Sequence, residues 1–309
     1  MEKIAHIDAT TTDEAVAALG SDAAIIAGGT DIYNALKAYI YADAPQTLVN
    51  IKTIPGLEYI KEEGGMLKIG ALTRLADIAD SSVVQAKWSS LAQAALLVGS
   101  PQLRHQGTIG GNICQNCRCW YYRAEHNQFH CFRKGGNLCF LTLGRSEKHS
   151  AILGGQVCFT NSVSDTAIPL TALGATVVTT KRNIDIGDFF VTLGDILDDD
   201  EIVTEIQVPE PAANTKQVFL KWAERKAIDF AEASVAIAIS SSDAKIVLGS
   251  VAPTPWRATD AESTVSGQTI TEALAITAGE EAVNGAITIL DNTYKIQLVK
   301  TLVKRALLA

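Results

Sequence analysis

The chain has 309 residues, of which 47% are hydrophobic, so it is long enough to bury a substantial core in two or three domains. Its net charge of −8 at pH 7 argues against nucleic acid as a partner, because phosphate recognition requires a basic surface. The longest nearly apolar run, residues 233–239, is far too short to cross a bilayer, and the N-terminus lacks a signal-peptide pattern. We therefore expect a cytoplasmic protein with no membrane partner.

Residues 1–55 have the pattern of a small α/β unit. The apolar periodicity predicts a short helix over residues 13–19 and an apolar strand over residues 23–27. After a glycine turn it predicts a second helix over residues 32–41 and a second strand over residues 46–51. Thr11 or Thr12 is the expected N-cap of the first helix, because a hydroxyl there accepts a hydrogen bond from an otherwise unpaired amide.

Residues 56–210 have the pattern of a second α/β unit, interrupted by a cysteine-rich segment over residues 114–158. We predict a hairpin of residues 57–61 with 66–69, and helices over residues 74–79, 88–98 and 164–173. A strand pair is predicted over residues 176–180 and 183–186. Five acidic residues near the end of this unit are expected in a solvated turn: Asp195, Asp198, Asp199, Asp200 and Glu201.

A linker is predicted over residues 209–214, where two prolines and small polar residues break the periodicity. Three strands follow, over residues 217–222, 234–240 and 245–250. The remainder is mostly helical, with strong apolar periodicity over residues 296–309. The third unit, residues 215–309, is therefore predicted to be an α+β domain, and the whole chain falls in the α+β class.

Two glycine-rich loops are candidates for phosphate binding. In the first, residues 27–31, a strand runs through Gly28 and Gly29 into a helix, so the backbone can approach a phosphate at a helix N-terminus. Such a turn also occurs as a tight connection with no ligand. The second, residues 106–112, interleaves three glycines with Thr108 and Asn112 and exposes amides that can cradle a pyrophosphate.

All six cysteines lie between Cys114 and Cys158. Disulfides are rare in a reducing compartment, so the clustering favours metal ligands. Spacing alone leaves two kinds of site open. Four thiolates hold an iron–sulfur cluster, whereas a structural zinc takes four cysteines or a mixture with His126, His130 or His149.

The two glycine-rich loops belong to a set of five patterns that occur in one order along the chain. They are AGGTD at residues 27–31, GTIGGN at 107–112, Ser-Asp-x-x-x-Pro at 164–169, and Lys-x-x-x-Arg-x-x-x-Asp at 221–229 followed by APTPWR at 252–257. In this arrangement the chain resembles, over essentially its whole length, the FAD-binding medium subunit of molybdenum hydroxylases, the xanthine dehydrogenase and carbon monoxide dehydrogenase superfamily.

The resemblance implies a two-part FAD-binding domain of the PCMH type, divided into residues 1–55 and 56–210, and a C-terminal domain like that of the carbon monoxide dehydrogenase flavoprotein, residues 215–309. It also implies FAD contacts at Ala27, Gly28, Gly29, Thr30, Asp31, Thr108, Gly110, Gly111, Asn112, Ser164, Asp165 and Lys221. The alternative for Lys221 is a surface ion pair with Glu224 or Asp229.

The cysteine spacing resembles a subgroup that carries an additional [4Fe–4S] cluster, similar to the beta subunit of 4-hydroxybenzoyl-CoA reductase and to periplasmic aldehyde oxidoreductases. The implied ligands are Cys119, Cys131, Cys139 and Cys158. The reductase places its last ligand where this chain has Lys148, whereas the aldehyde oxidoreductases have a cysteine shortly before the Ser-Asp pair, which corresponds to Cys158. Cys114 and Cys117 remain alternatives for the fourth ligand.

The function implied is that of an FAD and [4Fe–4S] electron-transfer subunit in a heterotrimeric oxidoreductase. Its expected partners are a large molybdenum-cofactor subunit, a small [2Fe–2S] subunit and an external redox carrier, NAD or ferredoxin. We expect no catalytic side chain in this subunit, because the substrate chemistry belongs to the molybdenum partner. Two other functions stay open: a stand-alone flavin dehydrogenase and a zinc-stapled, non-catalytic subunit.

Overall fold

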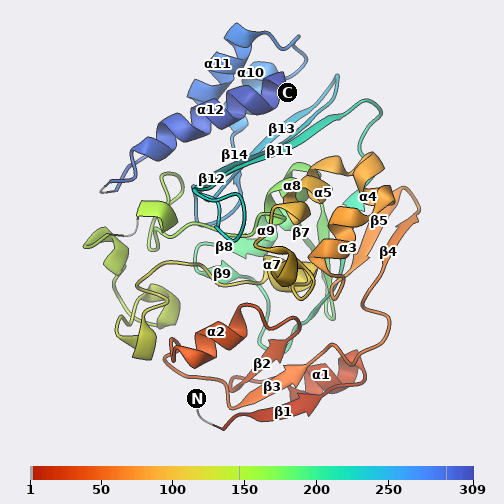
Figure 1. The fold of residues 1–309 in the computed structure, drawn as a ribbon, viewed down its shortest axis with the longest axis vertical. Coiled ribbons are helices and arrows are strands. Elements are labelled where there is room, and N and C mark those ends of the chain that lie inside the picture. The colour runs from red at the N-terminus through yellow and green to blue at the C-terminus, as the bar shows by residue number, and fades with distance from the viewer. Residues whose placement is uncertain (1–2, 146, 290) are drawn as a thin grey trace.

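A computed structural model describes residues 3–145, 147–289 and 291–309. Three units follow one another along the long axis, with the N-terminal unit at one end and the C-terminal helices at the other (Figure 1). The cysteine-rich segment lies to one side, beside all three units (Figure 1). The predicted α+β organisation, a two-part first half followed by a C-terminal sheet with helices, is confirmed.

The first unit is a three-stranded parallel sheet in the order β1-β3-β2, with two short helices. Its elements are β1 (Ala5–Asp8), α1 (Thr12–Ala18), β2 (Ala23–Ile26), α2 (Ile32–Lys37) and β3 (Thr47–Asn50). Thr11 is the N-cap of α1, since its hydroxyl accepts a bond of 3.1 Å from the Glu14 amide. Helix α2 ends earlier than predicted because Tyr39 adopts a φ of 52°. All four residues of strand β1 are exposed, so its short apolar–polar alternation does not correspond to a buried face.

The second unit is a five-stranded antiparallel sheet in the order β4-β5-β10-β6-β7. Its strands are β4 (Ile60–Glu63), β5 (Met66–Gly70), β6 (Thr176–Thr179), β7 (Asn183–Asp185) and β10 (Val203–Pro209), and a separate small pair is β8 (Phe190–Val191) with β9 (Gly194–Asp195). Its helices are α3 (Leu75–Asp80), α4 (Ser82–Lys87), α5 (Ser89–Leu96), α6 (Pro101–Arg104), α7 (Ile109–Ile113), α8 (Ala167–Ala172) and α9 (Ile186–Phe189). The central strand, β10, was not predicted.

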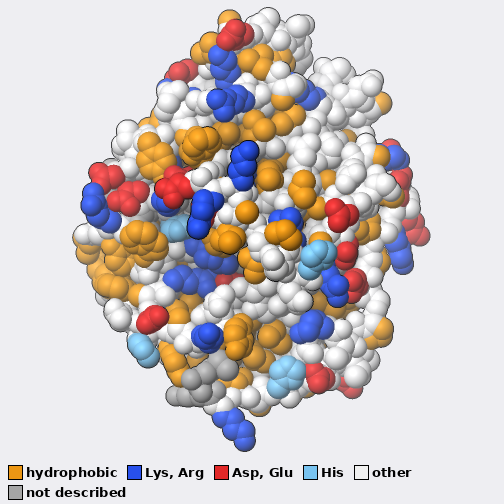
Figure 2. Space-filling view, viewed as in Figure 1, with side chains coloured by type: hydrophobic (Ala, Val, Ile, Leu, Met, Phe, Trp, Pro, Cys, Tyr) orange, Lys and Arg blue, Asp and Glu red, His pale blue; other side chains and the backbone are white. Residues whose placement is uncertain are grey.

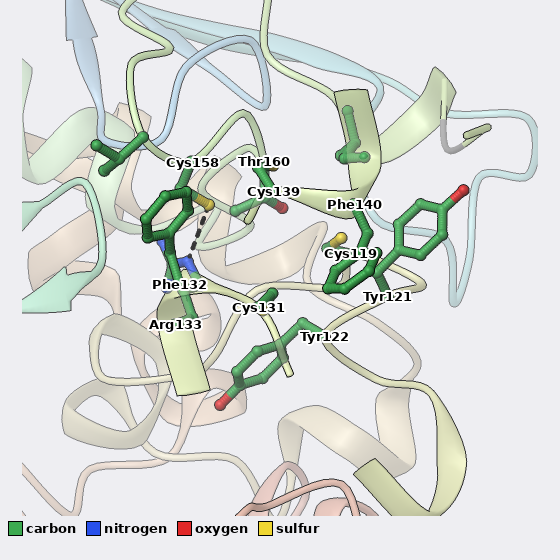
Figure 3. Close-up of a pocket in the computed structure, with 12 residues that line it drawn as sticks. Cys119, Tyr121, Tyr122, Cys131, Phe132, Arg133, Cys139, Phe140, Cys158 and Thr160 are labelled. Carbon is green, nitrogen blue, oxygen red and sulfur yellow. Dashed lines mark hydrogen bonds between the residues drawn. The ribbon is translucent and has the colours of Figure 1, made fainter. Parts of the chain in front are cut away.

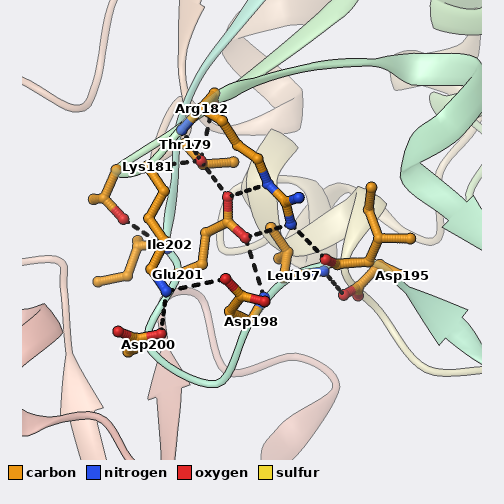
Figure 4. Close-up of polar contacts among 11 residues, drawn as sticks. Thr179, Lys181, Arg182, Asp195, Leu197, Asp198, Asp200, Glu201 and Ile202 are labelled. Atoms are coloured by element: carbon orange, nitrogen blue, oxygen red, sulfur yellow. Dashed lines mark hydrogen bonds and ion pairs between the residues drawn. The ribbon is translucent and has the colours of Figure 1, made fainter.

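The expectation of a solvated acidic turn is wrong for Glu201. Its side chain is fully buried and accepts bonds from the Thr179 hydroxyl (2.6 Å) and the Arg182 guanidinium (2.9 and 3.0 Å). Asp198 and Asp200 do face solvent, where both pair with Lys181 (Figure 4). Hydrogen bonds and ion pairs of the acidic stretch therefore connect the β6–β7 turn to the residues just before β10 (Figure 4).

The third unit is an antiparallel sheet in the order β11-β12-β13-β14, with a layer of helices on one face (Figure 1). Its elements are β11 (Lys216–Trp222), β12 (Ala233–Ile239), β13 (Ala244–Gly249), β14 (Trp256–Arg257), α10 (Thr259–Val265), α11 (Glu272–Glu281) and α12 (Tyr294–Leu308). The predicted periodicity of the last helix is confirmed, because α12 buries Val299, Leu302, Val303, Ala306 and Leu307. The other face of the sheet packs on α5 and α8, so the second and third units share a core.

The cysteine-rich segment has little regular structure. Its described residues form four short 3-10 turns, over Glu125–Asn127, Phe132–Lys134, Phe140–Thr142 and Glu147–His149. A small aromatic core holds it together: the Phe129 ring lies 5.1 Å from the rings of both Tyr121 and Phe140. Of the helices that the structure describes, none combines the length and the apolar character needed to cross a bilayer.

Lys295, on α12, joins the third unit to the end of this segment. Its side chain is completely buried, and its ammonium group donates to the carbonyls of Lys148 (2.8 Å), Ser150 (3.0 Å) and Ser250 (3.0 Å). Burial of the charge lowers the pKa of Lys295 to about 7. A charge held by carbonyls alone costs free energy that an exposed lysine does not.

This burial predicts an unusual pH dependence of stability. The unfolded chain holds the Lys295 proton up to about pH 10.5 and the folded chain only to about 7, so the folded state gains stability as the pH rises between these values. From pH 7 to 9 the free energy of unfolding of the native chain should rise by about 2 kcal/mol relative to that of Lys295→Met. Urea denaturation at each pH measures this difference. Lys300→Met, on the same helix, should keep the rise, and a constant difference between native and Lys295→Met would refute the prediction.

Candidate functional site

The two glycine-rich loops lie against each other, although more than seventy residues separate them in the sequence. A Cβ atom on Gly28 would lie only 2.0 Å from the carbonyl oxygen of Gln106, at the start of the second loop. Gly29 adopts a φ of 70°, which other residues rarely adopt. The first loop must therefore lack side chains at both positions, and the glycine pair serves the approach of one loop to the other.

The second loop is the first turn of α7. Thr108 is the N-cap, and its hydroxyl accepts a bond of 3.2 Å from the Gly111 amide. A Cβ atom on Gly110 would lie 3.0 Å from the Ala71 carbonyl, so this turn sits tightly against the end of β5. Asn112, at the other end of the loop, is buried and points away from solvent.

Asn112 joins the second loop to the Ser-Asp pair. Its side-chain oxygen accepts bonds of 2.7 Å from the hydroxyls of Ser164 and of Thr166. All three side chains are buried. The structure therefore brings Asn112 and Ser164 together as the sequence implied, and it adds Thr166, which sequence reasoning missed.

Lys221 and Asp165 form a buried ion pair of 2.6 Å, and both side chains are at least 93% buried. Lys221 also donates to the Leu97 carbonyl at 3.0 Å. Burial raises the pKa of Asp165, and the neighbouring ammonium opposes this rise. The alternative of a surface ion pair is wrong, because Glu224 pairs with Lys148 and Asp229 with Arg225.

The carboxylate of Asp31 bonds to other residues of the chain. One oxygen lies 2.7 Å from a nitrogen of Arg123 and 3.0 Å from a nitrogen of Arg118, and the other accepts a bond of 2.9 Å from the Asn116 amide. All of these partners belong to the cysteine-rich segment. Sequence reasoning missed both arginines, since nothing in their spacing links them to a residue some ninety positions earlier.

The four implied metal ligands line a single cavity. Cys119, Cys131, Cys139 and Cys158 surround it together with aromatic residues and Arg133 (Figure 3). The space measures about 300 Å³, including a part that opens to solvent. All six cysteines are free of disulfides. Among the described residues, no three His, Cys, Asp or Glu side chains are arranged to hold a single metal ion.

The thiols of the cavity differ in acidity. A hydrogen bond from the Cys158 thiol lowers the pKa of Cys139 to about 6, and the same bond, with burial, raises the pKa of Cys158. Burial raises the pKa of Cys131 and brings the pKa of Cys119 to about 12. Arg133 approaches the Cys158 sulfur at 3.5 Å, so one positive charge stands beside the thiols (Figure 3).

The other candidates for ligation lie in different places. Cys117 is buried in the same cluster of side chains as Cys119 and Cys131, whereas Cys114 packs against the core of the second unit. Lys148, at the position of the reductase ligand, pairs with Glu224 at 2.6 Å. Among the described residues that line the cavity there is no histidine.

Comparisons with known proteins identify the family to which the chain belongs. The family described as the FAD binding domain in molybdopterin dehydrogenase matches residues 2–120 and 141–211, and the CO dehydrogenase flavoprotein C-terminal domain matches residues 218–309. The chain belongs to the family of FAD-binding medium subunits of molybdenum hydroxylases. The stretch between the two matched parts of the first domain holds Cys131 and Cys139.

Two relatives cover nearly the whole chain. The aldehyde oxidoreductase FAD-binding subunit PaoB of Escherichia coli (strain K12) is 31% identical over 90% of this chain and 88% of its own length. The carbon monoxide dehydrogenase medium chain of Hydrogenophaga pseudoflava is 30% identical over 94% of this chain and 89% of its own. A solved structure of that carbon monoxide dehydrogenase covers 100% of this chain and 97% of its own, with a TM-score of 0.79 and 29% identity. The family members are oxidoreductase subunits, and FAD binding belongs to the matched domain.

The contact between the two loops predicts that Gly28→Ala is costly. The added methyl group collides with backbone rather than with a movable side chain, so the free energy of unfolding should fall by about 1–3 kcal/mol and FAD content should drop. Urea denaturation and the flavin absorbance of the purified protein measure the two effects. Gly20→Ala in the same unit is the control, because its nearest neighbour would be 3.8 Å away. Equal stability of the two variants would refute this account of the loops.

Proposed function

We propose that the chain is the FAD- and iron–sulfur-containing electron-transfer subunit of a heterotrimeric enzyme of the molybdenum hydroxylase type. Its partners in this proposal are a large subunit with the molybdenum cofactor and a small subunit with [2Fe–2S] clusters. The observation that carries the proposal is the grouping of four cysteines around one cavity, in a segment that is bonded directly to the first glycine-rich loop. The division into residues 1–55, 56–210 and 215–309 is part of the same proposal.

The residues proposed to hold FAD come from all three units. The loops around Gly28 and Gly110 offer backbone without side chains, which suits a pyrophosphate. The buried pair of Lys221 with Asp165 would supply one hydrogen-bond donor and one acceptor to the polar edge of a flavin. A bound flavin ring exchanges electrons one or two at a time. The remaining proposed contacts are Ala27, Gly29, Thr30, Thr108, Gly111, Asn112 and Ser164, whereas the carboxylate of Asp31 is occupied by arginines.

The cavity fits a [4Fe–4S] cluster better than a zinc ion. A structural zinc requires four ligands that converge on one point at about 2.3 Å. The ligands of a cubane cluster bind four different iron atoms, so four thiols spaced around a cavity suit it. The donor set supports the same choice, since the cavity offers thiols and aromatic walls but no histidine among the described residues. Such a cluster carries one electron at a time.

The choice of Cys158 as fourth ligand places the chain nearer the aldehyde oxidoreductase pattern than the reductase pattern. Cys158 lines the cavity, whereas Lys148 points to Glu224. Cys117 lies close enough to remain the alternative ligand, and Cys114 does not.

The surface of the cysteine-rich segment suits a protein electron carrier. Hydrophobic side chains gather on the left of the face in Figure 2, over this segment, with charged side chains of both signs beside them. Trp120 is 56% exposed and Leu143 71% exposed. Two basic side chains of the segment are exposed, Arg145 (75%) and Lys148 (43%), whereas Arg118 and Arg123 are only 17% exposed. We propose that the cluster is the port for a one-electron carrier such as ferredoxin, and that the enzyme works in the cytoplasm.

The first test is the absorption spectrum and metal content of the purified chain. We expect one FAD and close to four iron atoms per chain, with flavin bands over a broad absorbance in the visible blue. Replacing Cys119, Cys131, Cys139 or Cys158 by Ser should abolish iron binding, whereas Cys114→Ser should keep the iron content of the native chain. Flavin without iron would favour a stand-alone flavin dehydrogenase, and a colourless zinc protein would favour the zinc-stapled subunit.

The port is tested in the assembled enzyme. Replacement of Cys131 and Cys139 by Ser should remove the cluster and abolish ferredoxin-linked turnover, because the carrier loses its contact with the flavin. Turnover with a small artificial acceptor that reaches the flavin directly should continue and serves as the control. Ferredoxin-linked activity that survives loss of the cluster would show that electrons leave by another route.

A further inference from the structure

We infer that Asp31 is a positioning residue that couples the FAD site to the cysteine-lined cavity, so that each cofactor strengthens the binding of the other. The inference rests on the proposed function, because it assumes both cofactors. It goes beyond that function in assigning to Asp31, Arg118 and Arg123 the task of holding the two sites together. None of the three would need to touch the flavin or the cluster.

Asp31 ends the first glycine-rich loop and begins α2, so its position is set by the loop. Its three bonds all reach the start of the cysteine-rich segment: two guanidinium groups and the amide of Asn116. The three charged side chains are no more than 20% exposed, which keeps water from screening the contact. Within the described residues, Asp31 is the one carboxylate that pairs with either arginine.

The two arginines in turn hold the backbone that leads into the ligands. Arg123 donates to the Cys117 carbonyl at 2.8 Å and to the Asn116 carbonyl at 3.1 Å. Arg118 also donates to the Asn116 carbonyl, and it is the residue directly before Cys119. The position of the first implied ligand is therefore tied through arginine side chains to the first loop.

Arg118 extends the link to the third unit. Its guanidinium lies 4.5 Å from the centre of the Phe230 ring, in the loop that follows β11 and Lys221. Cation–π contacts of this kind are strongest when the cation is shielded from water. The network thus touches the first loop, which is proposed to hold FAD, the loop that follows the strand of Lys221, and the segment proposed to hold the cluster.

Loss of the Asp31 charge would leave two close guanidinium groups facing each other. Breaking a partly buried ion pair on one side is costly because the remaining charges are uncompensated. The arginines would then separate, and the backbone at Asn116 and Cys117 would lose its fixed position. A cofactor on either side of the network restrains this motion, which is the physical basis of the coupling, and such coupling acts equally in both directions.

The experiment measures FAD affinity of the full chain with and without the cluster. FAD is titrated into the FAD-free protein and followed by flavin fluorescence, for the iron-loaded chain and for the iron-free Cys131→Ser, Cys139→Ser chain. In the native background we expect loss of the cluster to weaken FAD binding on the order of 10-fold. In the Asp31→Asn background, loss of the cluster should weaken FAD binding by less than twofold, because Asp31 no longer links the first loop to the cysteine-rich segment.

Glu262→Gln is the matched control. Glu262 also pairs with one arginine, Arg257, and accepts a backbone amide, that of Ile246 at 3.0 Å, but it lies in the third unit away from both sites. Its variant should keep the 10-fold effect. Arg123→Gln removes one of the two guanidinium contacts and leaves Asp31 paired with Arg118, so the effect of the cluster on FAD affinity should fall between roughly twofold and 10-fold. It serves as a second variant if Asp31→Asn folds poorly, and an undiminished 10-fold effect in it would contradict the coupling.

The outcomes separate the coupling from the proposed function. An equal effect of the cluster on FAD affinity in native and Asp31→Asn chains, or no effect in the native chain, would overturn the coupling while both cofactors are present. A native chain that takes up FAD but no iron would instead contradict the proposed cluster, and the coupling would fall with it.

Discussion

The buried pair of Lys221 with Asp165 is the constraint on which the arrangement of the units depends. Burying either charge alone would cost several kcal/mol, so the third sheet must meet the second unit where these two side chains meet. The Leu97 carbonyl, at the end of α5, takes a second bond from Lys221. Packing of α5 and α8 on the same sheet then encloses the pair.

The cysteine-rich segment depends on the rest of the chain in a different way. It has few hydrogen-bonded elements of its own, and its aromatic core is small. Its position is fixed by charged contacts instead: Asp31 at its start and Lys295 at its end. A segment held at both ends by buried charges can present four cysteines around one cavity without a sheet or helix beneath them.

Several features were predictable because they rest on local patterns. In the helix over Tyr294–Leu308 and in the strands of the third sheet, the apolar positions of the sequence pattern are the ones buried in the fold. The Thr11 cap was predictable because it involves only one side chain and one nearby amide. Strand β10 was missed because acidic residues precede it and Pro209 ends it, so its neighbourhood resembles a loop. Strand β1 was missed because its apolar–polar alternation spans only four residues, all of them exposed at the edge of a sheet.

The sequence by itself determined the family, the two glycine-rich loops and the grouping of the cysteines, because motifs and spacings are written in the order of the residues. Only the tertiary structure decided how these parts meet. It turned Asp31 toward Arg118 and Arg123, paired Lys221 with Asp165 rather than with its neighbours, and put Cys158 but not Lys148 on the cavity. Such choices depend on which charges and thiols are buried together, and burial is a property of the folded chain that no local pattern records.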